Sequence, residues 1–531
     1  MARFFPGYLL PLALAATAPC QAPNGHGIGE IEYDLRIRAG DPAASIRMTL
    51  AGVTADEIRV AMPIWRPGSY TVQSFEEAVS DVTATAAGEQ LSITYPDPDR
   101  GVWAVATGGH QRFVIEYKLQ LRGHGIGPPQ RLRTEEGTSR GYRTYLLQVP
   151  ATWLYVEGHL DVPHSVTFDL PEEWGVATGM TRTEDPRRYT CPDYDVFADC
   201  PMHLGVFERL SFEVHDVEHE VILSGFEKRR ESREALIQRF EKIVRASCDM
   251  MGPPPYERYV FLLSFPGGGG LEHLNSTTIS MMSLEGSDDR HNSIWDSLVS
   301  HEFFHLWNVK RLRPAALGPF DYGDVDPNRT RYLWVCEGVT SYFGDLLCVR
   351  AGLWDEETYW TTNIAEQINI LQRNPGRKKV SISEASWTVW DFPYMARGRT
   401  APDYYNKGQL LGLLLDIEIR DATDNRASLD DVMRGLYQQC MESGRGFADG
   451  DFRRWCEEVS GRSFEAFFAD YVDGTAELPF VETLAKIGVV ATPPQPVPGK
   501  PERRRGRWRI GLTSDADDRG AQIRRAMARG Q

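Results

Sequence analysis

Short runs of alternating hydrophobic and polar residues occupy the first part of the chain. Between about Ile31 and Phe212, stretches such as IEYDLRI, RFVIEYKLQL and SVTFDL alternate in this way, with Gly, Pro and Asp between them. Alternation of this kind indicates strands with one buried face, and many short strands predict an antiparallel β-sandwich. One segment, MPIWRPGSY at 62–70, breaks the pattern, and its two prolines favour an edge or loop over a central strand.

The hydrophobic period becomes helical from Arg230 onward. The stretch SREALIQRFEKIVRASCDMM predicts an amphipathic helix, and apolar strands are expected at 259–263 and 277–282. Helical patterns then dominate, notably at 294–309, 331–351 and 404–420. We therefore expect a multidomain α+β fold, with an N-terminal antiparallel β-sandwich followed by a mixed sheet and a mainly helical lobe.

A chain of 531 residues is too long for one hydrophobic core. The pattern places a signal peptide at 1–20, a β-domain at 27–215 and a second domain of mixed strands and helices at 216–490. After Val490 the composition shifts to TPPQPVPGKP, which is typical of an extended linker, so residues 491–531 form a separate terminal segment.

The composition excludes some partners. Hydrophobic residues make up 42% and charged residues 25%, as in ordinary globular proteins, and the formal charge of -16 argues against nucleic acid. Arg3, a short apolar stretch and Ala16-Thr17-Ala18 resemble an export signal, which favours a periplasmic or secreted protein over a cytoplasmic one. No other run approaches the ~18 apolar residues of a membrane span, so we expect no integral membrane segment.

Cysteine usage leaves one question open. Cys191 and Cys200 flank a loop-like stretch, CPDYDVFADC, and can form a disulfide in an oxidising compartment or remain two unrelated thiols. The sequence does not decide between these two states.

The motif His301-Glu302-Phe303-Phe304-His305 lies inside an apolar helical run. Residues four apart lie on one face of a helix, so His301 and His305 present two imidazoles to one point, as a tetrahedral zinc site requires. Glu302 sits beside them and is placed to take a proton from a metal-bound water. The alternative is that both histidines are partly buried and bind no metal, but the specificity of the motif favours a zinc site.

An acidic residue appears in an unexpected setting further along. Glu337 lies among apolar residues in the helical pattern RYLWVCEGVTSYFGDLLCVRA, 337 − 305 = 32 positions after His305. A carboxylate there is costly unless it is paired or bound to a metal.

Four stretches together resemble one family of enzymes. They are GGGGLEHLNST (267–277), SHEFFHLWNVKRLRP (300–314), WVCEGVTSYFGDL (334–346) and YYNKGQLLGLLLDIEIR (404–420), and they are similar to the glycyl aminopeptidases, zinc metallopeptidases of the thermolysin-like group. MPIWRPGSY, WLYVEG and WGVATGM also look like that family's N-terminal domain. The resemblance spans roughly residues 30–490 and implies a β-domain, a thermolysin-like catalytic domain and a C-terminal PDZ domain.

The resemblance also implies roles for individual residues. It makes Glu337 the third ligand of one zinc ion per chain, with Glu302 as the general base. Tyr405 fits the tyrosine of the family's Y-x-K-G motif, which stabilises the oxyanion, and Tyr404 is the other candidate for this role. The alternative is that Tyr405 only packs in the core at the start of a helix. Glu272 looks like the acid that binds the free α-amine of a substrate.

The glycines before Glu272 have a role of their own in this picture. Gly269 and Gly270 lie in a glycine-rich edge that suits backbone pairing with a bound peptide. Together with Glu272 they form the expected substrate-binding set.

The expected activity is therefore a zinc aminopeptidase that removes small N-terminal residues, glycine or alanine, from peptides with a free N-terminus. A broader endo- or aminopeptidase and a non-catalytic, zinc-stabilised peptide-binding protein are the alternatives. The terminal RWRIGLTSDADDRGAQIRR resembles the start of a PDZ domain and then stops. About 40 residues are too few to form the hydrophobic core of a PDZ domain without help, so we expect a truncated and disordered remnant of such a domain.

Overall fold

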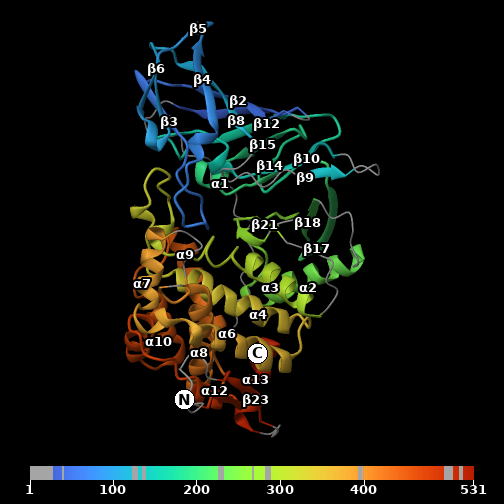
Figure 1. Cartoon of the computed structure of the whole chain (residues 1–531), viewed down its shortest axis with the longest axis vertical. Helices are drawn as coiled ribbons and strands as arrows, with labels where there is room; N and C mark the ends of the chain where they lie inside the picture. The colour runs from blue at the N-terminus through green and yellow to red at the C-terminus, as the bar shows by residue number, and fades with distance from the viewer. Residues whose placement is uncertain are drawn as a thin grey trace.

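The computed structural model describes residues 28–38, 41–121, 130–133, 139–224, 232–265, 268–280, 289–392, 398, 400–495, 506–513 and 518–531. The signal peptide expected at 1–20 lies outside these residues. Figure 1 shows a β-domain at one end of the long axis and a body of sheet and helices below it. The predicted multidomain α+β fold is confirmed.

The β-domain consists of three sheets within the described residues. The largest has the order β14 (Thr181–Arg182), β15 (Arg188–Cys191), β12 (His164–Asp169), β1 (Glu30–Arg36), β2 (Ala43–Ala51), β8 (Arg112–Gln120), β4 (Val79–Ala86) and β5 (Glu89–Gln90). The second has the order β13 (Gly175–Thr178), β16 (Met202–Gly205), β10 (Ser139–Leu147) and β9 (Gln130–Arg133). The third has the order β11 (Tyr155–Val156), β3 (Glu57–Ala61), β7 (Val102–Ala106) and β6 (Ile93–Asp97).

The alternation of hydrophobic and polar residues explains why this part of the chain folds as strands with one buried face. In β8, every second residue of RFVIEYKLQ is buried, and the strand pairs antiparallel with β2 and β4. The buried faces share one hydrophobic core with the short helix α1 (Tyr194–Ala198). The pairing is antiparallel as predicted, apart from β1 and β12, which run parallel.

A five-stranded mixed sheet begins the second body. Its order is β17 (Glu208–Val214), β18 (Val217–Ser224), β19 (Arg258–Ser264), β21 (Ser276–Ser280) and β20 (Gly269–Glu272). The central strands β18, β19 and β21 are parallel, and β17 and β20 are antiparallel edges. Because β17 pairs with β18, this sheet starts upstream of residue 216, where we expected the catalytic region to begin.

Helices α2 (Arg233–Met251) and α3 (Asp289–Phe304) pack on this sheet and against each other. The remaining helical lobe follows in the lower part of Figure 1. It comprises η6 (Trp334–Val339), α4 (Thr340–Arg350), α5 (Glu356–Thr358), η7 (Tyr359–Ile364), α6 (Ala365–Arg373), α7 (Ile382–Trp387), η9 (Thr388–Asp391), α8 (Tyr404–Ala422), α9 (Leu429–Ser443), α10 (Asp451–Ser460), α11 (Glu465–Phe467), η11 (Phe468–Val472) and α12 (Phe480–Ala485). Its apolar faces merge with α2, α3 and the sheet into one continuous core.

The terminal segment packs on this body. Strand β23 (Arg509–Leu512) pairs antiparallel with β22 (Val489–Thr492), and α13 (Arg519–Arg529) lies against α4. Ile523 and Met527 are buried in the common core. The expectation of a disordered remnant is therefore wrong for residues 506–513 and 518–531: a core too small to stand alone is completed by the neighbouring helices.

Two further points concern the described residues as a whole. Cys191 and Cys200 are free, buried thiols that lie within hydrogen-bonding contact of each other, so the disulfide is not formed here. A helix long and apolar enough to cross a bilayer is absent from the part of the chain that the structure describes.

The two bodies are joined through buried polar and aromatic contacts. Asp199, which follows α1, accepts hydrogen bonds from the ring of His273 (3.0 Å), the backbone of Leu274 (2.6 Å) and Lys310 Nζ (2.8 Å). At a second junction, the indole of Trp65 donates to the carbonyl of Asp321 at 2.7 Å. Both contacts reach segments of the second body that adjoin the site described next.

Candidate metal centre and active site

The two motif histidines lie at the C-terminal end of α3. The helix ends at Phe304, although the backbone N–H of His305 still donates to the carbonyl of His301 at 3.2 Å. Beyond this point Leu306 and Trp307 bond three residues back, which tightens the last turn and ends the helix. The predicted helix 294–309 is thus shorter at its end, and His305 occupies the final turn.

Glu337 comes from a helical segment of unusual geometry. The sequence predicts one α-helix over 331–351, whereas the structure has the π-helical η6 over Trp334–Val339 before α4 begins. A π-turn holds an extra residue per turn, and such turns are frequent at functional sites. Here it places Glu337 against α3, with only 1% of the residue exposed.

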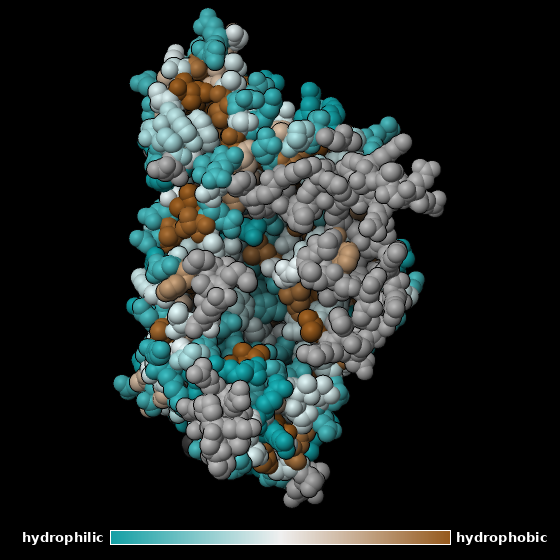
Figure 2. Space-filling model, viewed as in Figure 1, coloured by the Kyte–Doolittle hydropathy of each residue, from teal (hydrophilic) through white to brown (hydrophobic). Residues whose placement is uncertain are grey.

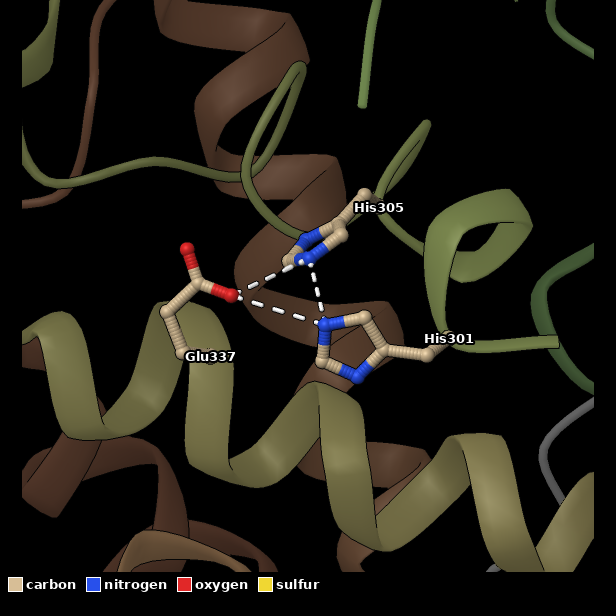
Figure 3. Close-up of side chains that lie close together, drawn as sticks. All are labelled: His301, His305 and Glu337. Atoms are coloured by element: carbon tan, nitrogen blue, oxygen red, sulfur yellow. Dashed lines mark hydrogen bonds and ion pairs between the residues drawn. The ribbon is translucent and has the colours of Figure 1, made fainter. Parts of the chain in front are cut away.

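These three side chains converge on one point, as Figure 3 shows. The Nε2 atoms of His301 and His305 are 2.9 Å apart. Oε2 of Glu337 lies 3.5 Å from Nε2 of His301 and 3.2 Å from Nε2 of His305. Ligands at about 2.0–2.1 Å from a tetrahedral ion are separated by similar distances, so the three atoms match the ligand spacing of zinc.

The other nitrogen of each imidazole is held by a neighbour. Nδ1 of His305 donates to the carbonyl of Asn308 at 2.7 Å, and Nδ1 of His301 lies 3.3 Å from the hydroxyl of Ser341. That hydroxyl itself donates to the carbonyl of Glu337 at 2.8 Å. Partners at Nδ1 leave the Nε2 lone pairs directed at the common point, which is the usual arrangement around metal-binding histidines.

The residues therefore fit a zinc ion, the metal that two imidazoles and one carboxylate hold in catalytic sites. Within the part of the chain that the structure describes, Oε1 of Glu337 is buried without a hydrogen-bond partner, which is costly for a carboxylate that has no ion to neutralise it. Burial acts against ionisation, but the charge of His305 and hydrogen bonds from both histidines lower the pKa of Glu337 to about 2. The carboxylate is thus ready to bind a cation.

Glu302 lies beside this point. It is 5% exposed, and its Oε2 atom has no hydrogen-bond partner among the described residues. Burial, together with the nearby carboxylates of Glu272 and Glu337, holds its pKa well above the ordinary value of 4.5. A Cβ at Gly270 would overlap the carboxyl group of Glu302, so the absence of a side chain there makes room for this acid.

Glu272 ends the edge strand β20 and approaches the same centre. Ligand atoms of Glu272, Glu302 and His305 all lie within 4.8 Å of one another. The carboxylate is buried, and its Oε1 atom also has no hydrogen-bond partner. Gly269 and Gly270 precede it on the exposed edge of the sheet, where β20 pairs on one side with β21. A peptide can add to the other side of such an edge.

The start of α8 supplies two tyrosines. The ring of Tyr405 is half-buried with its centroid 6.0 Å from that of His301, and the ring of Tyr404 is buried and stacks on Tyr405 at 4.9 Å. Helix α8 approaches η6 so closely that a Cβ at Gly338 would overlap the backbone of Gly408. This close packing brings the tyrosines to the metal ligands.

The β-domain also reaches the site, which sequence reasoning missed. The segment 62–70 follows β3, and Figure 1 shows it as a blue loop that descends towards the helical lobe. Gly68 lies so close to Glu272 that a Cβ would be 2.7 Å from both carboxylate oxygens. Tyr70 is buried in the core of the second body. The prolines and aromatic residues of this segment were the visible signal, although they indicated only a rigid loop.

The molecular surface is hollowed near the centre of the face shown in Figure 2, below the β-domain, and hydrophobic residues lie along parts of the border of the hollow. Clefts of this kind, between a sheet and a helical lobe, are common binding sites for ligands.

Two family models match the chain. The model of the M61 N-terminal domain covers residues 32–206, and the model of the M61 glycyl aminopeptidases covers residues 295–411, which include all three converging ligands. The chain belongs to the M61 glycyl aminopeptidase family. It is accordingly a metallopeptidase of the zinc aminopeptidase class.

Solved structures with the same fold support this assignment. An aminopeptidase N family protein from Idiomarina loihiensis is 26% identical with a TM-score of 0.78, over 87% of this M61 chain and 79% of that one. An M1 zinc metallopeptidase from Deinococcus radiodurans is 14% identical with a TM-score of 0.52, over 86% of this chain and 96% of that one, and shows the fold alone. No curated protein matches the chain. Neither family model reaches the terminal segment, so the expected PDZ remnant has no support.

Proposed function

We propose that this M61 chain is a zinc-dependent aminopeptidase that removes glycine or alanine from the N-terminus of peptides. The observation that carries the proposal is the convergence of two imidazoles and Glu337 on one point. Beside it lie two buried carboxylates that each keep one oxygen without a hydrogen-bond partner among the described residues. His301, His305 and Glu337 would hold one zinc ion. When bound, zinc polarises the scissile carbonyl and lowers the pKa of water to about 7.

Glu302 is the proposed general base. Its raised pKa suits a group that accepts a proton from water and passes it to the leaving amine near neutral pH. The contact with Gly270 limits where the carboxyl group can move, so the proton acceptor stays beside the ligands.

Tyr405 is the proposed donor to the oxygen that becomes negative during hydrolysis. Its half-buried ring lies beside His301, whereas Tyr404 is packed behind it, which favours Tyr405 of the two. A hydrogen-bond donor of this kind typically lowers the barrier by about 3 kcal/mol.

Glu272 is the proposed acceptor for the α-amine of the substrate. Its unpartnered Oε1 lies near the end of the exposed edge strand, so a peptide aligned along Gly269 and Gly270 would meet a carboxylate where its chain begins. A substrate with a blocked amine would leave this charge uncompensated, and that explains removal of single residues rather than internal cleavage.

A panel of aminoacyl p-nitroanilides, free and N-acetylated, tests these roles with and without a chelator. We expect zinc-dependent cleavage of the free glycyl and alanyl compounds and none of the acetylated ones. Glu272→Gln should reduce cleavage of free substrates by 100-fold or more, the scale of a lost charge-assisted contact of about 3 kcal/mol. Equal cleavage of acetylated and free compounds would instead indicate the broader endopeptidase alternative.

The export signal remains a prediction that supports a periplasmic or secreted location. N-terminal sequencing of the protein purified from its native source tests it, with cleavage near Ala18 as the expected result.

A further inference from the structure

The segment of the β-domain that approaches Glu272 carries an unusual backbone conformation. Tyr70 has φ of +48°, a left-handed conformation that is uncommon for residues other than glycine and asparagine. Such a conformation costs on the order of 1–3 kcal/mol and persists when the surroundings impose it, which is frequent at functional sites.

The ring of Tyr70 packs into the other body. Among the described residues that precede β17, Tyr70 alone belongs to the buried core of the catalytic body. Its ring contacts Trp390 of η9 edge-on, with centroids 5.8 Å apart, and Trp390 contacts Trp65 of the same loop at 5.3 Å. Trp390 therefore contacts both Tyr70 and Trp65 and holds this loop of the β-domain against the helical lobe.

Tyr70 lies beside Glu272, the acid that would bind the amine of the first substrate residue. A Cβ at Gly68, two residues before Tyr70, would be 2.7 Å from both carboxylate oxygens of Glu272, and Tyr70 and Glu272 line the same cavity. Tyr70 also belongs to the buried core that contains Cys336, the residue before Glu337. In the proposed function the α-amine lies at Glu272 and the adjacent carbonyl at the ion held by Glu337. The Cα atom of the first residue must lie between them, alongside Tyr70.

The space beside Tyr70 and Glu272 is small. Tyr70, Glu272, Trp65 and Gly68 line a cavity of about 80 Å³ together with charged residues such as Lys310. A cavity of about 150 Å³ holds a benzene ring, so one of about half that volume suits a small side chain better than a large one.

We propose that Tyr70 is a specificity-determining residue, whose ring closes the subsite for the first side chain of the substrate so that only glycine or alanine fits. The inference rests on the proposed aminopeptidase function and adds a residue from the β-domain to its active site. The β-domain is then part of the catalytic unit, because it supplies one wall of the subsite.

Tyr70→Gly is the informative variant, because glycine adopts a positive φ without strain while removing the ring. We expect the ratio of kcat/KM for leucyl over alanyl p-nitroanilide to rise at least tenfold, since each methylene that becomes accommodated changes discrimination by 10-fold or more. Tyr70→Phe keeps the ring and should keep the ratio. Tyr95→Gly, in strand β6 of the same domain, is the matched control and should also keep it.

A binding measurement provides a second readout. On the Glu302→Gln background, calorimetric titration with free L-leucine and L-alanine should show leucine gaining at least tenfold over alanine when Tyr70 is replaced by glycine. Tyr70→Asn, which also tolerates a positive φ, serves if the glycine variant does not fold.

The outcomes separate the two proposals. If the wild-type enzyme with zinc cleaves no aminoacyl p-nitroanilide, the aminopeptidase proposal fails. If it cleaves alanyl p-nitroanilide and a folded Tyr70→Gly variant keeps the wild-type ratio, only the assignment of Tyr70 fails. A ratio that changes equally in Tyr70→Phe and Tyr70→Gly also overturns it, because the ring is then not the cause.

Discussion

Two regions of this protein bury acidic residues in opposite ways. At the seam between the bodies, Glu220 of β18 is fully buried and contacts three arginines, Arg182, Arg209 and Arg258. Arg258 also donates to the carbonyls of Thr178 and Met180 in the β-domain, at 3.0 and 2.8 Å. Both carboxylate oxygens of Glu220 therefore form ion pairs with arginines of the protein.

At the metal centre, by contrast, Glu272, Glu302 and Glu337 each keep a buried oxygen without a hydrogen-bond partner, and none of the three carboxylates forms an ion pair with an arginine or lysine among the described residues. An unpaired buried carboxylate destabilises a fold unless something else compensates it. The ion pairs around Glu220 thus stabilise the fold, whereas the metal centre is arranged to receive a cation, a proton and a substrate amine from outside. Three predictions test this contrast.

The largest effect is expected at Glu302. Replacement by glutamine removes the base but keeps the shape, so kcat should fall by about 10³-fold or more, equivalent to about 4 kcal/mol of barrier. The melting temperature should stay the same or rise, because the raised pKa means that the ionised acid destabilises the folded state. Steady-state kinetics, zinc analysis and thermal unfolding measure the three quantities together.

Two results would contradict the claim that Glu302 serves catalysis and not stability. One is a glutamine variant with normal kcat, and the other is a variant that unfolds at clearly lower temperature. The exposed Glu465 offers a control, since its change to glutamine should alter neither quantity.

The intermediate effect is expected at Glu220. In Glu220→Gln, three arginines surround a neutral amide, and we expect a loss of about 2–3 kcal/mol in the free energy of unfolding. This is below the ~3–5 kcal/mol of a fully buried pair, because the side chains of Arg182 and Arg209 are 46% and 38% exposed. Urea unfolding measures it, while kcat per folded molecule should be unchanged.

Glu218 on the same strand is the matched control. It lies 3.5 Å from Arg182 and both side chains are 46% exposed, so Glu218→Gln should cost less than about 0.5 kcal/mol. Equal losses in the two variants would show that burial is not what makes Glu220 important.

The smallest effect per residue concerns two buried histidines of the β-domain. Burial lowers the pKa of His164 and of His203 from 6.5 to about 4. The unfolded chain therefore binds more protons than the folded one between pH 6.5 and 4, and stability falls as the pH falls through this window. Each histidine should cost about 1.5 kcal/mol between pH 6.5 and 5.

Urea unfolding of the chelator-treated enzyme at these two pH values avoids any contribution from metal loss. His203→Phe should reduce the pH dependence by one histidine's share, since burial is the sole cause of the shift at that residue. An unchanged slope would mean that His203 is protonated in the folded state.

Much of this arrangement could be predicted from local patterns. The spacing of His301 and His305 follows from helix periodicity, and Glu337 stands out as an acid among apolar residues. Strand alternation likewise predicts the β-sandwich. The spacing of Ser428 and Asp431 is that of a capping box, which these residues form at the start of α9.

Other features depend on contacts between segments far apart in the chain, which periodicity does not report. The approach of Tyr70 and Gly68 to Glu272 is one, because it depends on how two bodies dock. The packing of α13 on α4 is a second such feature. The apolar residues of α13 suggested a separate terminal domain and gave no sign that they contact α4. The adjacent thiols of Cys191 and Cys200 likewise could not be assigned a bond from spacing alone.

The π-turn of η6 has a consequence for how this enzyme tolerates change. Glu337 must face His301 and His305, while Gly344, two turns further along α4, must lie against the backbone of His301. The additional residue in the π-turn lets both requirements hold, because it rotates the side chains of all later helix residues by about 100° around the helix axis. Deleting a single residue between Trp334 and Val339 would restore a regular helix and swing either the carboxylate or the glycine out of place. Insertions and deletions that are harmless in other helices would here abolish the ion-binding geometry.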